Sequence, residues 1–138
     1  MSIGKAIHSR LSAHSGTSAL VSARIYPMRL PQPPTYPAVR YQVIGAPRTH
    51  AMGVDTGEVH ARVQVDCYAT TYSGVRALAD QVRLALNRWG DTAGGVVVDH
   101  VLLDEERDAD EPTVVRDGER GVYRVMMDFL AHYQEAVA

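Results

Sequence analysis

The segment from Val59 to Ala69 alternates strictly between apolar and polar residues, and this pattern most constrains the fold. One set of positions is apolar: Val59, Ala61, Val63, Val65, Cys67 and Ala69. The intervening set is polar or aromatic: His60, Arg62, Gln64, Asp66 and Tyr68. A period of two places the two sets on opposite faces of a β-strand. The chain is therefore expected to build a sheet with one packed face and one polar face.

Weaker patterns predict further strands over 24–26, 39–43, 96–103 and 121–133. Two amphipathic helices are also expected. The first carries the stripe Ile3, Ile7 and Leu11 and ends before Gly16; the second starts at an N-cap Ser73, extends to Trp89 and stops at Gly90. This order predicts an α+β fold, a mainly antiparallel β-sheet with two α-helices packed on one face, in a single domain over 1–138.

Three segments interrupt this pattern. The prolines between Pro27 and Pro37 predict an extended arm at the edge of the sheet. Residues 45–58 have no regular period and are expected to form the long loop of a β-hairpin. The acidic stretch that begins at Asp104 predicts a second excursion over 104–120, as a solvated loop or as a charged contact with a neighbour.

Composition narrows the functional classes. The net charge of −2 provides no general attraction to nucleic acid, and no apolar run is long enough to span a membrane. The only cysteine, Cys67, excludes an internal disulfide and suits a reducing cytoplasm. It lies on the apolar face of its strand, which favours a small buried side chain over a reactive thiol.

Motifs for catalysis and cofactor binding are missing from the sequence. Neither a nucleophile elbow nor a phosphate-binding or dinucleotide-binding glycine motif occurs. The six histidines lack the spacing of metal ligands, although His60 and His132 could meet across neighbouring strands. We therefore predict no catalytic, cofactor-binding or metal-binding residues, no cofactor and no enzymatic activity.

The order of segments resembles a known family over nearly the whole chain. The most specific parts are the proline arm that leads into PAVRYQ (37–42) and the strand RVQVDCYA (62–69). Together with the two helices and the closing segment 121–125, they resemble the tail-terminator, or tail-completion, family of siphophages and gene transfer agents. The segment after Glu111 looks longer than the usual hairpin of that family.

The resemblance implies a virion structural protein at the head-proximal end of the tail, assembled in the host cytoplasm. Such a subunit would close into a homo-oligomeric ring, sixfold in this family, that stops polymerisation of the tail tube protein. The ring would also offer a surface to the head–tail connector or head-completion protein for head–tail joining. DNA could pass through its lumen without specific binding, beside arginines of the arm, the hairpin and the polar sheet face.

Two groups of residues are candidates for these contacts. The polar sheet face carries the candidate subunit interface: Arg62, Asp66, Arg124 and Asp128. The hairpin loop carries the candidate tube contact: Arg48, His50, Met52 and Asp55. Two alternatives remain open at this stage. One is a head-completion or connector protein of the same particle, and the other is a small cytoplasmic ligand-binding or enzymatic α+β domain.

Overall fold

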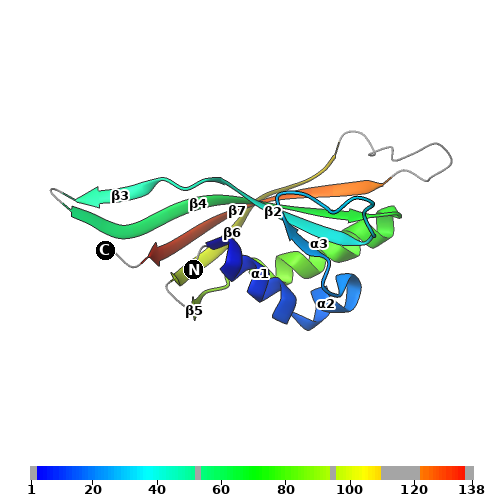
Figure 1. Cartoon of the computed structure of the whole chain (residues 1–138), viewed down its shortest axis with the longest axis horizontal. Helices are drawn as coiled ribbons and strands as arrows, with labels where there is room; N and C mark the ends of the chain where they lie inside the picture. Colours follow the sequence, from blue (N-terminus) through cyan, green and yellow to red (C-terminus); the bar gives the residue numbers. More distant parts are fainter. Residues whose placement is uncertain (1–2, 52–53, 94–95, 110–121, 136–138) are drawn as a thin grey trace.

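The computed structural model describes residues 3–51, 54–93, 96–109 and 122–135, and within these ranges it contains three helices and seven strands (Figure 1). The elements are α1 (Ile3–Ala13), α2 (Ser15–Val21), β1 (Ile25–Pro27), β2 (Ala38–Gly45), β3 (Arg48–Ala51), β4 (Val54–Ala69), α3 (Tyr72–Leu86), β5 (Asp91–Ala93), β6 (Val96–Asp108) and β7 (Tyr123–Glu135). The predicted α+β class is confirmed, with one helix more than expected.

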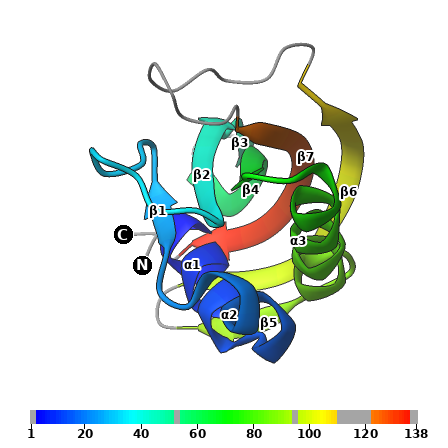
Figure 2. The ribbon, with the colours of Figure 1, turned by 90° about the vertical axis from the view of Figure 1, so that its right-hand side faces the viewer.

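All strands belong to one sheet of order β1-β2-β4-β7-β6-β5, and β3 pairs with β4 outside this path. Only the short edge pair β1–β2 is parallel among the described strands. The long central pair β4–β7 keeps one register from Glu58 opposite Gln134 to Ala69 opposite Tyr123. The sheet curves over the helices, which cover one of its faces (Figures 1 and 2).

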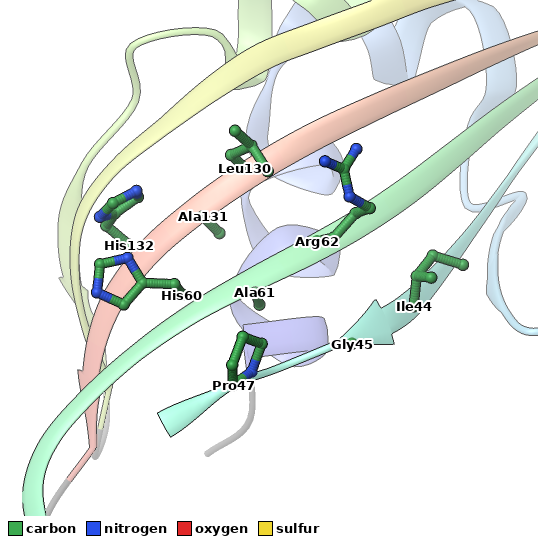
Figure 3. Close-up of a pocket in the computed structure, with 9 residues that line it drawn as sticks. All are labelled: Ile44, Gly45, Pro47, His60, Ala61, Arg62, Leu130, Ala131 and His132. Carbon is green, nitrogen blue, oxygen red and sulfur yellow. The ribbon is translucent and has the colours of Figure 1, made fainter. Parts of the chain in front are cut away.

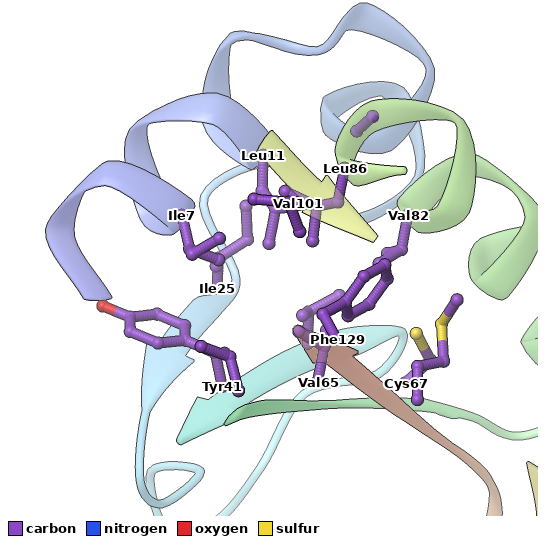
Figure 4. Close-up of a cluster of buried hydrophobic side chains, with 14 of the residues drawn as sticks. Ile7, Leu11, Ile25, Tyr41, Val65, Cys67, Val82, Leu86, Val101 and Phe129 are labelled. Carbon is purple, nitrogen blue, oxygen red and sulfur yellow. The ribbon is translucent and has the colours of Figure 1, made fainter. Parts of the chain in front are cut away.

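The core lies between the helices and the covered face of the sheet (Figure 4). Every apolar residue of the alternating set between Val59 and Ala69 is at most 4% exposed, as the pattern predicted. Cys67 belongs to this core, and burial raises the pKa of its thiol, which keeps the thiol protonated. None of the described helices combines the length and the apolar character that a membrane span needs.

The helix boundaries differ from the predicted ones. Gly16 does not end the first helix but lies inside α2, whose N-cap is His14; the backbone N–H of Thr17 donates to His14 Nδ1 at 3.3 Å. Helix α3 starts earlier than predicted, because Thr71 rather than Ser73 is its N-cap and accepts the N–H of Gly74 at 3.0 Å. Threonine and serine both cap helices, so the sequence pattern could not distinguish Thr71 from Ser73 as the N-cap of α3.

The segment after α3 also differs from the prediction. The helix ends at Leu86, so Trp89 lies beyond it instead of on its stripe. Residues 87–89 run along β6 instead: Arg88 N–H donates to the carbonyl of Val101 at 2.6 Å, and Val101 N–H donates to the carbonyl of Trp89 at 2.9 Å. This pairing covers part of the free edge of β6.

Replacing Gly90 by alanine is expected to lower the free energy of unfolding by about 1–3 kcal/mol. A Cβ atom at this position would lie 2.5 Å from the backbone carbonyl oxygen of Asp99 and 3.0 Å from that of Val98, so backbone would have to move. Gly45→Ala is the control, because a Cβ there meets no heavy atom within 4 Å. Urea unfolding measures the stability of both variants. Equal stability would contradict the close approach of residue 90 to the backbone of Val98 and Asp99.

Both predicted excursions are partly strand. The prediction of a long loop over 45–58 is wrong, because β3 and the start of β4 pair there, with His50 opposite Asp55. The prediction of an excursion that begins at Asp104 is wrong for residues 104–108, because β6 continues to Asp108 and pairs with β7. The rest of that excursion, 110–120, lies outside the described residues, as does Met52.

Candidate functional site

We call the face of the sheet opposite the helices the open face. On it lies a band of charged side chains that also includes one glutamine. It is formed by Arg40, Arg62, Gln64, Asp66, Asp104, Glu105, Arg107, Arg124 and Asp128 from β2, β4, β6 and β7. All four residues predicted for the subunit interface lie in this band. Side chains alternate between the two faces of a strand. These four residues therefore point away from the core, while the apolar residues of the same strands pack into it.

Asp66 is the centre of the first charge cluster. Its side chain is fully buried, yet it forms ion pairs with Arg40 and Arg124, whose side chains are 20% and 27% exposed. Arg40 lies directly across the β2–β4 pair, and Arg124 Nη2 donates to Asp66 Oδ2 at 2.9 Å. Gln64 Nε2 donates to the other carboxylate oxygen at 2.9 Å. One carboxylate therefore holds two guanidinium groups.

The two arginines extend this cluster to neighbouring segments. Arg40 Nη1 donates to the carbonyl oxygen of Met28 at 3.1 Å, which ties the proline arm to the sheet. The guanidinium of Arg124 lies 5.7 Å from the ring centroid of Tyr68, within the range of a cation–π contact. The two arginines carry one positive charge more than Asp66 neutralises, so the cluster is suited to meet an acidic surface.

Asp128 is the centre of the second cluster. Arg107 Nη1 donates to Asp128 Oδ2 at 3.1 Å, and this hydrogen bond raises the pKa of Arg107. Arg62 Nη1 lies 4.0 Å from the same oxygen and donates to Asp104 Oδ2 at 3.1 Å. The Arg62 and Asp104 side chains are 44% and 43% exposed, so their pair contributes little to stability. These charges remain accessible to a partner.

Arg107 was not among the predicted site residues, because the strand was expected to end at Leu103. Past the bulge near Asp104 the strand keeps alternating its side chains between the two faces, but residues 104–108 are all charged, so the sequence shows no apolar period that would have identified Arg107. The same alternation turns Glu106 and Asp108 to the helix side, where both pair with Arg76 of α3 at 3.2 and 3.3 Å. Part of the acidic stretch therefore attaches α3 to the sheet.

Three histidines from three neighbouring strands lie side by side on the same face. The ring centroids of His60 and His132 are 4.2 Å apart, so the expected meeting across the strands is confirmed. His100, which the sequence did not indicate, stacks on His132 at 4.4 Å. Desolvation, together with the two neighbouring imidazoles, lowers the pKa of His132. Across the described ranges, no three or more ligating side chains are arranged to hold a metal ion.

A pocket of about 440 Å³ opens beside this histidine row (Figure 3). Its walls come from the end of β2, the link to β3, and the facing parts of β4 and β7. The lining residues are Ile44, Gly45, Pro47, His60, Ala61, Arg62, Leu130, Ala131 and His132. The pocket thus combines apolar walls with one arginine and two imidazoles.

Three of the four residues predicted to contact a tube, Arg48, His50 and Asp55, lie on a hairpin at one end of the molecule (Figure 1), whereas Met52 is outside the described residues. Arg48 is exposed on β3, and His50 and Asp55 are paired across β3 and β4. Pairing of β4 with β7 begins at Glu58, so residues 54–57 extend past the described part of β7. The hairpin is therefore a projection from the sheet.

Comparisons with known proteins agree with this fold. The family model of tail completion protein gp17 matches residues 5–134. A solved chain from the structure "Virion of native gene transfer agent (GTA) particle" superimposes with a TM-score of 0.69 at 15% identity, over 96% of this chain and 94% of that chain. A comparison with curated protein sequences gives no match. The family match confirms the resemblance inferred from the sequence. The chain therefore belongs to the tail completion protein gp17 family and is a structural component of a virion tail.

Proposed function

We propose that the chain is the subunit of a tail-terminator ring, which caps the head-proximal end of the tail tube. Copies of the chain recognise the end of the tube, close into a ring, stop further tube polymerisation and present a new surface for head–tail joining. The proposal rests on membership of the tail completion family and on one structural observation. Among the described residues no helix covers the open face of the sheet, and that face carries side chains already held in place by ion pairs.

The ring contact belongs, in this proposal, to the open face. Of the four predicted residues, Arg62 and Arg124 are the more accessible, and arginine pairs well with carboxylates of an adjacent subunit. Asp66 is buried and Asp128 nearly so; their role is to hold these arginines rather than to touch the neighbour themselves. Because the guanidinium groups are positioned before assembly, little side-chain entropy is lost when the neighbour binds.

The tube contact belongs to the hairpin that carries Arg48, His50, Met52 and Asp55. Residues 54–57 of β4 lie beyond the described register with β7 and span about 13 Å, which takes the hairpin past the described part of that strand. Two strands alone are marginally stable in water, so the hairpin gains stability when a partner packs on it. The partners in this proposal are neighbouring copies of the chain, six per ring as the family resemblance implies, together with the tail tube protein and the head–tail connector.

Electron microscopy of particles made without this gene tests the proposal. Overlong tubes detached from filled heads, corrected by adding the purified protein, are the expected result, and symmetry averaging of the restored caps then counts the subunits. Tubes of normal length beside tailless heads would overturn termination and favour a head-completion protein. Adding Arg62→Glu protein should fail to restore the caps, whereas Arg83→Glu on the exposed side of α3 should restore them.

A further inference from the structure

We propose that the pocket beside the histidine row binds an acidic side chain of a partner protein, presented on an extended segment next to an apolar residue. The pocket shares Arg62 with the proposed ring contact but adds His60 and His132, which that contact does not use, and the inference would hold for a partner from either side of the head–tail joint. It rests on three features of the pocket: its apolar walls, its cationic and imidazole groups, and their coupling to protons.

The apolar walls favour a protein segment. Ile44 is 48% exposed on the described surface, and Leu130 and Pro47 stand beside it in the pocket lining. An exposed isoleucine at the mouth of a pocket loses apolar surface to water when a partner covers it. At about 440 Å³ the pocket has room for one or two side chains but is small for a folded element.

The polar groups specify a carboxylate. Arg62, His60 and His132 line the pocket, and no acidic residue is among the described residues of its lining. The carboxylates that pair with Arg62 belong to Asp104 and Asp128, outside the lining. Figure 3 shows the imidazoles of His60 and His132 side by side at one end of the pocket, with Arg62 further along the same strand. A carboxylate between them would receive charge-assisted hydrogen bonds.

Binding of a carboxylate should be coupled to the uptake of a proton by the histidines. His132 is held in its neutral form by desolvation and by His60 and His100, while Asp99 and Glu58 oppose this effect. A bound carboxylate adds a negative charge next to the imidazoles and favours their protonated forms. Binding therefore takes up a proton and strengthens as the pH falls from about 7.5 to about 6, where the ligand carboxylate remains ionised.

The probes are two labelled, end-capped peptides that alternate valine with either aspartate or asparagine. Fluorescence polarisation with the full chain should show binding of the aspartate peptide that tightens by about threefold to tenfold between pH 7.5 and pH 6, as uptake of one proton requires. The asparagine peptide should bind weakly at both pH values. In a His60→Gln, His132→Gln double variant the pH dependence should disappear, whereas His8→Gln on the helix side should retain it.

NMR titration of the His132 ring provides a second readout that needs no variant. The aspartate peptide should raise the pKa of His132 in the unmodified chain. Equal binding of the two peptides, an unchanged His132 titration, or tighter binding of oligothymidylate than of the aspartate peptide would each overturn the proposal. The last result would assign the pocket to nucleic-acid phosphate instead.

Discussion

Replacing Asp66 by asparagine is expected to lower the free energy of unfolding by about 3–5 kcal/mol, because it removes the charge that holds two partly buried arginines. Asparagine has nearly the same volume, so the loss reports charge rather than packing. The variant leaves Arg40 and Arg124 close together without a counter-charge. Their Nε atoms are already buried without a hydrogen-bond partner among the described residues, so little compensation is available. Urea unfolding followed by circular dichroism measures the difference.

Asp104→Asn is the matched control on the same face. Its pair with Arg62 is exposed on both sides, and such pairs contribute about 0–1 kcal/mol. A loss below about 1 kcal/mol for Asp66→Asn would contradict the view that this carboxylate organises the open face. If the proposed ring is correct, Asp66→Asn protein that still folds should also cap tubes poorly, because Arg124 is no longer held in position.

The location of Asp66 was predictable from the sequence, whereas its burial was not. Alternation over Val59–Ala69 assigns each residue to a face, and every apolar member of the set is buried as expected. Whether a polar residue on the other face is exposed depends on side chains from neighbouring strands. Arg40 and Arg124 cover Asp66 from both sides, and their arrival depends on the pairing register, which a single sequence does not contain.

The two segments that were expected to be loops could not be predicted as strands from the sequence. Their strands show no apolar alternation, because the start of β4 in the hairpin lies beyond the described register with β7 and the end of β6 is charged on both faces. Glu106 and Asp108 lie on the helix side, where Arg76 of α3 forms ion pairs with both. Charge compensation from a distant helix replaces apolar periodicity, and local sequence patterns do not report it.

Replacing Leu86 by alanine is expected to lower the free energy of unfolding by about 2–5 kcal/mol, the loss of a fully buried side chain plus the cavity it leaves. Leu86 is the last residue of α3, and Figure 4 shows its side chain among core residues from α1, β6 and β7. The described helices lie on one face of the sheet, and the core between them and that face stabilises the fold. Urea unfolding is again the measurement.

Leu84→Ala is the control, because it deletes the same atoms two residues earlier on the same helix. Leu84 is 56% exposed, and alanine is at least as good a helix former, so its loss should stay within about 0.5 kcal/mol. Similar losses for both variants would mean that α3 packs on a different side from the one described. A large loss for Leu86→Ala alone would support the layer arrangement, and with it the assignment of the uncovered face as the surface available for assembly.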